Sequence, residues 1–229
     1  MCIDRLPGGK SLIRPPSHCP ACGYRLKPVD LIPVVSYLML RGKCRVCSSS
    51  IPRRVLAVEV VTGSLFAFLI WRFNPGVNLA IAILFTCLLL VIAVIDIEYS
   101  LILNILTYPG ILIALMCSFL RPEIGITGSI IGLFSGLVTI VIIIYASRGG
   151  MGIGDAKMAA LVGAILGFPM VFLALLVAVV TGGIVAVILI AAKLKGRKDR
   201  IPFGPFLAWG GWLALVFGKD ILSWYLGVS

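Results

Sequence analysis

The sequence predicts an all-α polytopic membrane protein, with about seven transmembrane helices and a small zinc-binding lobe. Of its 229 residues, 60% are hydrophobic and only 13% are charged, whereas a soluble domain is nearer half apolar and a quarter charged. The apolar stretches are long and continuous, and they lack the alternation of apolar and polar residues that membrane β-barrels show. The composition therefore excludes an ordinary soluble domain and makes the lipid bilayer the surrounding medium.

Seven apolar spans follow a polar segment that is rich in Pro, Cys, Lys and Arg. We expect residues 1–54 to form a cytoplasmic lobe and residues 55–229 to form the transmembrane domain. The predicted spans are 55–71, 77–96, 101–120, 126–146, 157–170, 171–192 and 203–226. A crossing takes about 20 residues, so the fifth span is short. The sequence Gly167-Phe168-Pro169 after it predicts a tight turn.

The positions of the cations predict which side of the membrane each connection faces. With residues 1–54 in the cytoplasm and seven crossings, 17 of the 20 Lys and Arg residues fall inside, and only Arg72, Arg121 and Lys219 remain outside. The net charge of +11 then reflects membrane topology and suits an anionic inner leaflet. We expect no nucleic-acid partner.

Two aspartates stand at the cytoplasmic ends of predicted spans, in a chain with only nine acidic residues. Asp96 ends the second span and Asp155 begins the fifth, so two crossings, out and back, join them and allow them to meet. Two carboxylates that share a site hold one proton between them, and one can activate water while the other polarises a peptide carbonyl. This pattern is typical of aspartic proteases. His18 is the only histidine, so a Ser–His or Cys–His site inside the membrane lacks its base.

A glycine-rich loop, GGMGIGDAK, carries the second aspartate. Its Gly152 and Gly154 permit backbone angles closed to other residues and the close approach of a substrate strand. Lys157 is assigned a supporting role in this active-site loop at most. Each aspartate also has a structural interpretation, Asp155 as the N-cap of a helix and Asp96 as an interfacial residue at a helix end.

Four cysteines form two CxxC pairs, CPAC at Cys19–Cys22 and CRVC at Cys44–Cys47. Four thiolates from two CxxC pairs match the tetrahedral coordination of zinc. Thiols stay reduced in the cytoplasm, which argues against two disulfides. Two redox pairs and unligated thiols are the alternatives. A four-sulfur site leaves no position for water, so the zinc is expected to be structural and to order the lobe.

Taken together, several fragments resemble the prepilin peptidases, the bifunctional type IV leader peptidase and N-methyltransferase family. They occur in the family's order: RLP at Arg5–Pro7, the segment Cys19–Cys47, VE at Val58–Glu59, VIDIEYSLILN at Val94–Asn104, GMGIGDAKM at Gly150–Met158 and IPFGPFLAWG at Ile201–Gly210. By motif, the resemblance implies that the family's catalytic aspartates fall on Asp96 and Asp155, the pair that membrane depth already indicates.

The resemblance implies an aspartic endopeptidase that removes the positively charged leader of type IV prepilins or pseudopilins at the cytoplasmic face. It also implies methylation of the new N-terminus, with S-adenosylmethionine as the methyl donor. Glu59 is a candidate residue for this methylation. The alternative for Glu59 is an interfacial residue that faces lipid headgroups. The expected location is the plasma (inner) membrane of a prokaryote, with the lobe and the active site in the cytoplasm.

The chain departs from the family at two places. Family members usually carry a further transmembrane helix that ends just before the RLP stretch. Either this sequence begins too late or this member has lost that helix, and we expect the first. The family often has proline where Leu103 stands, which leaves the geometry of the short loop open.

Three other functions fit parts of the sequence. A presenilin-like or signal-peptide-peptidase-like GxGD protease pairs its GxGD with a Tyr-Asp motif, but here Ile95 precedes Asp96. A proton-coupled transporter needs protonatable groups near the bilayer midplane, whereas these carboxylates gather at one face. A zinc-bearing assembly scaffold without catalysis is the third.

Overall fold

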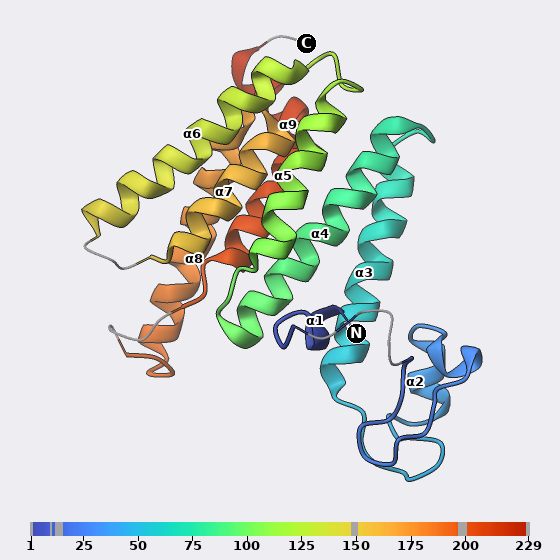
Figure 1. The fold of residues 1–229 in the computed structure, drawn as a ribbon. Coiled ribbons are helices and arrows are strands. Elements are labelled where there is room, and N and C mark those ends of the chain that lie inside the picture. The colour runs from blue at the N-terminus through green and yellow to red at the C-terminus, as the bar shows by residue number, and fades with distance from the viewer. Residues whose placement is uncertain (1, 10, 12–15, 148–150, 197–200, 228–229) are drawn as a thin grey trace. The chain divides into compact units, whose positions relative to one another are not determined.

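Helices make up nearly all the regular structure that a computed structural model gives for this protein (Figure 1). It describes residues 2–9, 11, 16–147, 151–196 and 201–227. The chain divides into two compact units, Met1–Asn74 and Pro75–Ser229. The predicted all-α fold class is confirmed. The predicted functional boundary after residue 54 stays a prediction.

The first unit combines the cysteine-bearing segment with one long apolar helix. Its elements are α1 (Cys2–Arg5), the 3-10 helix η1 (Pro28–Leu31), α2 (Val35–Met39) and α3 (Arg53–Arg72). α3 begins directly after Pro52, whose φ of −55° and ψ of 134° are extended. An ion pair between Asp4 and Arg54 joins α1 to the first turn of α3.

In its described part, the second unit is a bundle of six helices. They are α4 (Val77–Tyr99), α5 (Asn104–Ser118), α6 (Gly125–Ala146), α7 (Ile153–Leu166), α8 (Met170–Ala191) and α9 (Gly204–Leu226). Successive helices run in opposite directions, as Figure 1 shows. The C-terminal end of α4 and the N-terminal ends of α5, α7 and α9 therefore lie at the same end of the bundle, which is the end that carries both predicted catalytic aspartates.

Five of the described helices are long and apolar enough to cross a membrane, judged by length and composition. They are α3, α4, α6, α8 and α9. α5 is apolar but has 15 residues, and α7 has 14. These seven helices correspond to the seven predicted spans. At 1.5 Å per residue, α7 is about 21 Å long, shorter than the roughly 30 Å of a bilayer's hydrocarbon core.

α7 is the buried centre of the second unit. Eleven of its fourteen residues are buried, and it packs against α5, α6, α8 and α9. A Cβ on Gly132 of α6 or on Gly163 of α7 would strike the main chain of the other helix. Small residues at such contacts allow helices in membranes to pack closely. Because protein surrounds α7, its short length does not leave backbone groups facing lipid.

The connection between α7 and α8 is the tight turn that the sequence predicts. Gly167 ends α7 with a φ of 73°, a left-handed conformation that glycine adopts without strain. The N–H of Phe168 donates to the carbonyl of Gly128 at 3.1 Å, which holds the turn against α6. α8 then begins at Met170, directly after Pro169.

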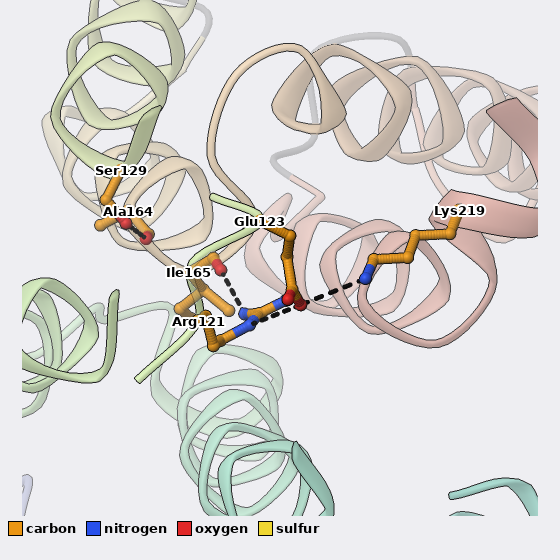
Figure 2. A network of polar contacts seen from close by, with 6 residues as sticks. All are labelled: Arg121, Glu123, Ser129, Ala164, Ile165 and Lys219. Carbon is orange, nitrogen blue, oxygen red and sulfur yellow. Dashed lines mark hydrogen bonds and ion pairs between the residues drawn. The ribbon is translucent and has the colours of Figure 1, made fainter. Parts of the chain in front are cut away.

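Polar side chains cap the C-terminal end of α7 (Figure 2). Nη1 of Arg121 donates to the carbonyl of Ile165 at 3.0 Å, and Oγ of Ser129 donates to the carbonyl of Ala164 at 2.6 Å. The last four carbonyls of a helix have no N–H donor within the helix itself, so these side chains supply donors to two of them. The cluster therefore fixes the end of α7 that is opposite to Asp155.

Glu123 completes this cluster. Its Oε1 lies 3.8 Å from Nε of Arg121 and 3.1 Å from Nζ of Lys219, which comes from α9. Although burial acts to raise it, the pKa of Glu123 lies below its usual value because Lys219 and Arg121 favour the carboxylate. The cluster thus connects the segment after α5 to both α7 and α9.

Candidate active site and metal centre

The four cysteines of the two CxxC pairs come together within the first unit. The Sγ atoms of Cys19, Cys22, Cys44 and Cys47 all lie within 4.8 Å of one another, and those of Cys19 and Cys47 are 3.8 Å apart. A tetrahedron with zinc–sulfur bonds of about 2.3 Å has edges of about 3.8 Å. The cluster therefore has the residue types and the spacing of a four-sulfur metal site.

The two CxxC turns share one backbone pattern. The N–H of Cys19 donates to the carbonyl of Tyr24 at 2.8 Å, and the carbonyl of Cys19 accepts the N–H of Gly23 at 2.9 Å. The turn at Cys44 repeats both bonds, at 2.8 and 3.1 Å. Gly23 has a φ of 71°, and Ser48, at the same place in the second turn, has a φ of 58°. The same tight turn is therefore formed at both CxxC pairs.

Ser49 is a polar neighbour of two of the sulfurs. Its Oγ lies 3.2 Å from Sγ of Cys47 and 3.5 Å from Sγ of Cys19. Its hydrogen bonding lowers the pKa of Cys19 to about 6 and also lowers the pKa of Cys47. Because the thiolate is the form that binds metal, Ser49 favours ligation by these two sulfurs.

Asp96 lies inside α4, one turn before the helix ends. Its side chain is buried, and the residue is 5% exposed. Oδ2 of Asp96 accepts the N–H of Gly204, the first residue of α9, at 2.9 Å. α4 continues to Tyr99, so Asp96 is a buried residue within the helix rather than an exposed residue at its end.

Asp155 is the third residue of α7 and is also buried, at 9% exposed. Its Oδ2 accepts the N–H of Gly152 at 3.1 Å. A side chain at the third position that reaches back to the N-cap amide is one half of a capping box. The N-cap is therefore Gly152. The structural interpretation that made Asp155 the N-cap is wrong, because it places the N-cap three residues too late in the sequence.

The segment that follows α4 lies against the start of α7. A Cβ on Gly154 would come 3.1 Å from Cβ of Ile102, a tighter contact than side chains normally make, so the glycine allows this close approach without a shift of Ile102. α4 and α7 also both pack against α9. The two carboxyl groups are near enough for the charge of Asp96 to act on Asp155. The structure thus places the two predicted catalytic residues near each other at one end of the second unit.

Lys157, the fifth residue of α7, faces α5. Its Nζ donates to Oδ1 of Asn104 at 2.9 Å and lies 5.5 Å from the centre of the Tyr108 ring. This contact joins the beginnings of α5 and α7 beside Asp155. Gly149 and Gly150, which belong to the predicted glycine-rich loop, lie outside the described residues.

Two family models match the sequence. The one described as "Bacterial Peptidase A24 N-terminal domain" matches residues 1–73, and the one described as "Type IV leader peptidase family" matches residues 83–187. The first match contains the four cysteines and Glu59, and the second contains Asp96 and Asp155. No solved structure matches the chain at a significant level.

Several curated relatives carry the name "Prepilin leader peptidase/N-methyltransferase". One from Dichelobacter nodosus is 37% identical over 216 residues, which cover 92% of this chain and 74% of the relative. One from Bacillus subtilis (strain 168) is 32% identical over 225 residues, which cover 98% of this chain and 91% of the relative. One from Pseudomonas aeruginosa is 32% identical over 221 residues, which cover 94% of this chain and 76% of the relative.

The chain belongs to the type IV leader peptidase family. Membership confirms the resemblance that the motifs indicate, from RLP near the N-terminus to IPFGPFLAWG before the last helix.

Glu59 of this leader-peptidase chain has a structural partner in the first unit. Its Oε2 accepts the N–H of Val34 at 2.7 Å. Val34 has a φ of 62°, which is costly for a β-branched residue, and it directly precedes α2. The carboxylate therefore stabilises the backbone where α2 starts, and a part for Glu59 in methylation stays a prediction.

Leu103, which stands where the family often has proline, has a backbone conformation that suits proline. It is the N-cap of α5, with a φ of −76° and a ψ of 128°, and proline fixes φ near −65°. The N-cap amide also lies outside the hydrogen-bond ladder of the helix. The departure at Leu103 is therefore compatible with a loop of the shape that proline would favour.

Gly204, Asn104 and Ser49 contact predicted site residues, although the motifs did not reveal their roles. Gly204 lies within IPFGPFLAWG and Asn104 ends VIDIEYSLILN, so both belong to fragments that carried the family resemblance. A local pattern could not show which side chain each would contact. Ser49 follows the second CxxC pair by two residues, in a run of three serines whose members look alike in sequence.

Proposed function

We propose that this protein is a membrane-embedded aspartic endopeptidase that removes leader peptides from type IV prepilins or pseudopilins. The observation that carries the proposal is the burial of Asp96 and Asp155 near each other at one end of the second unit. Both aspartates lie within the matched part of a leader peptidase family. The names of the relatives support prepilins as the substrate class.

In the proposed reaction, the pair of carboxyl groups carries one proton. The ionised carboxyl takes a proton from water while the water oxygen attacks the peptide carbonyl carbon, and the protonated carboxyl donates its proton to the carbonyl oxygen. The resulting diol then returns one proton to the second carboxyl as its C–O double bond re-forms. The C–N bond breaks, the first carboxyl protonates the leaving amine, and the pair regains its original state.

The proposed orientation places the end of the second unit with Asp96 and Asp155 at the cytoplasmic face. It rests on the 17 of 20 Lys and Arg residues that fall on that side when seven helices cross the bilayer. Alkaline phosphatase, which is active only outside the cytoplasm, should be active when fused after Gly227 and inactive when fused after Ser100. The reverse result would overturn the orientation.

We also propose that the four cysteines hold one Zn²⁺ ion. Four sulfur ligands close the coordination sphere, so the metal takes no part in peptide hydrolysis and instead orders the segment around the two CxxC turns. The 3.8 Å separation of two of the sulfurs supports this metal geometry.

N-methylation of the cleaved product is proposed from the names of the relatives. The methyl group of S-adenosylmethionine would move from sulfur to the new N-terminal amine, with release of S-adenosylhomocysteine and a proton. Transfer of an isotope-labelled methyl group to purified mature product tests this activity. If no label enters the product under conditions that allow cleavage, the protein is a peptidase alone.

The peptidase proposal is tested with purified protein and a prepilin whose basic leader ends in glycine. We expect a shorter product whose new N-terminus, read by mass spectrometry, directly follows that glycine. A cut within the hydrophobic helix of the substrate would favour a presenilin-like protease instead. An intact substrate would contradict the proposal and leave the transporter and scaffold functions.

A further inference from the structure

The first turn of α9 offers one backbone N–H to Asp96. Phe203 is the N-cap of α9, and its carbonyl accepts the N–H groups of Phe206 and Leu207, each at 3.1 Å. Pro205 has no N–H. The remaining amide of this turn is that of Gly204, which donates to Oδ2 of Asp96 at 2.9 Å across 108 residues of sequence. The Gly-Pro sequence thus presents a single N–H at this helix start, and Asp96 accepts it.

Only glycine allows this approach. A Cβ built on Gly204 would lie 2.6 Å from Oδ2, 3.0 Å from Cγ and 3.2 Å from Cβ of Asp96. Separations this short force one partner to move. Gly204 is itself buried, and α4 and α9 pack closely, so the movement would fall on the carboxyl group of Asp96.

We infer that Gly204 is a positioning residue for Asp96: its N–H fixes one carboxylate oxygen, and its lack of a side chain leaves room for the other atoms of the group. This inference rests on the proposed peptidase function. The second aspartate is held in a similar way, because Oδ2 of Asp155 accepts the N–H of Gly152. Each carboxyl group then uses Oδ2 for a backbone amide and leaves Oδ1 for water or the peptide.

The first test compares the activities of Gly204→Ala and Gly183→Ala with that of the unaltered protein. A misplacement of about 1 Å can cost roughly 100-fold in rate, so we expect kcat of Gly204→Ala to fall by about that factor with KM nearly unchanged. Gly183 lies on an exposed part of α8, with no atom within 4 Å of an added Cβ. Gly183→Ala controls for the general effect of alanine and should keep full activity. Full activity of Gly204→Ala would overturn the inference.

The second test measures thermal stability and needs no peptidase activity. Gly204→Ala is made in the unaltered chain and in an Asp96→Ala chain, which lacks the atoms that the new methyl group would strike. We expect a lower melting temperature in the first background and little change in the second, because contacting residues are energetically coupled. Should Gly204→Ala fail to fold alone, Asp96→Ala should restore folding. Equal losses in both backgrounds would overturn the inference.

The two tests also separate this inference from the proposed function. If Asp96→Asn cleaves prepilin normally, the catalytic assignment of Asp96 fails, whatever the stability measurements show. If Asp96→Asn is inactive but Gly204→Ala is fully active, the peptidase assignment stands and the role of Gly204 is wrong.

Discussion

Lys157 donates a hydrogen bond to Asn104 across the starts of α7 and α5, with 2.9 Å between Nζ and Oδ1. The two residues are 53 positions apart in sequence. Asn104 is the first residue of α5 and follows Asp96 in the chain, whereas Lys157 follows Asp155. The bond therefore joins α7, which carries Asp155, to the start of α5, which follows the helix that carries Asp96. The loop between α4 and α5 also contacts α7, through Ile102 and Gly154.

Loss of this bond should loosen the end of the bundle that holds the aspartates. We expect Lys157→Met to lower the free energy of unfolding by about 1 kcal/mol, the usual contribution of one hydrogen bond, and to reduce cleavage. Unfolding in a denaturing detergent titration measures the first effect. Combining Lys157→Met with Asn104→Ala should add little further loss. Additive losses would show that the two side chains do not interact.

The four-cysteine cluster should bind one zinc ion per chain. Cys19→Ser combined with Cys22→Ser removes two of four ligands, so the zinc content measured by elemental analysis should fall from about one ion per chain to nearly none. Cys117→Ser changes a thiol in α5 that lies outside the cluster and should leave the zinc content unchanged. Zinc retained at full occupancy by the double variant would contradict the assignment.

Ser48 offers a way to strengthen the second CxxC turn. It has a φ of 58° where the first turn has Gly23, and a left-handed conformation costs a residue with a side chain roughly 1–2 kcal/mol. Ser48→Gly should therefore slow the loss of zinc to a chelator. Ser50→Gly is the matched control, because Ser50 has no positive φ, and it should give no such gain. An equal effect of both changes would show that the conformation of Ser48 is not strained.

Arg121 should contribute more to stability than the lysine in the same cluster. Its side chain is 13% exposed, and it satisfies the carbonyl of Ile165, whereas the side chain of Lys219 is 70% exposed. Arg121→Met leaves the carbonyl of Ile165 without its side-chain donor and removes one of the two cations beside Glu123, so it should cost roughly 1–3 kcal/mol of unfolding free energy. Lys219→Met removes an exposed ion pair and should cost less than about 1 kcal/mol. The reverse order in detergent unfolding would contradict this ranking.

The helices and the metal cluster follow from local patterns. Long apolar stretches predict the helices from α3 to α9, because a membrane crossing requires a continuous run of apolar residues. The pairing of Cys19 with Cys22 and of Cys44 with Cys47 predicts the cluster, because each CxxC turn presents two sulfurs to one point. The apolar residues of each helix are contiguous in sequence, and the four metal-ligand candidates are all cysteines.

The partners of the two aspartates could not be predicted in this way. The bond from Gly204 to Asp96 spans 108 residues, and it depends on how α9 packs against α4 rather than on any local pattern. The hydrogen bond from the N–H of Gly152 to Asp155 is local. The sequence nevertheless predicts the N-cap at Asp155 and not at Gly152, because only the backbone shows where α7 begins. The burial of α7 likewise depends on close contacts with α6 that composition does not reveal.

Cleavage of a prepilin by purified Asp96→Asn and Asp155→Asn variants is the most direct test of the shared-proton mechanism. An amide has nearly the shape of the carboxyl group but cannot exchange a proton, so each variant should insert, keep its zinc and lose cleavage almost entirely. Asp220→Asn, at an exposed position near the other end of α9, should cleave at the normal rate. Normal cleavage by either Asp96→Asn or Asp155→Asn would contradict the account.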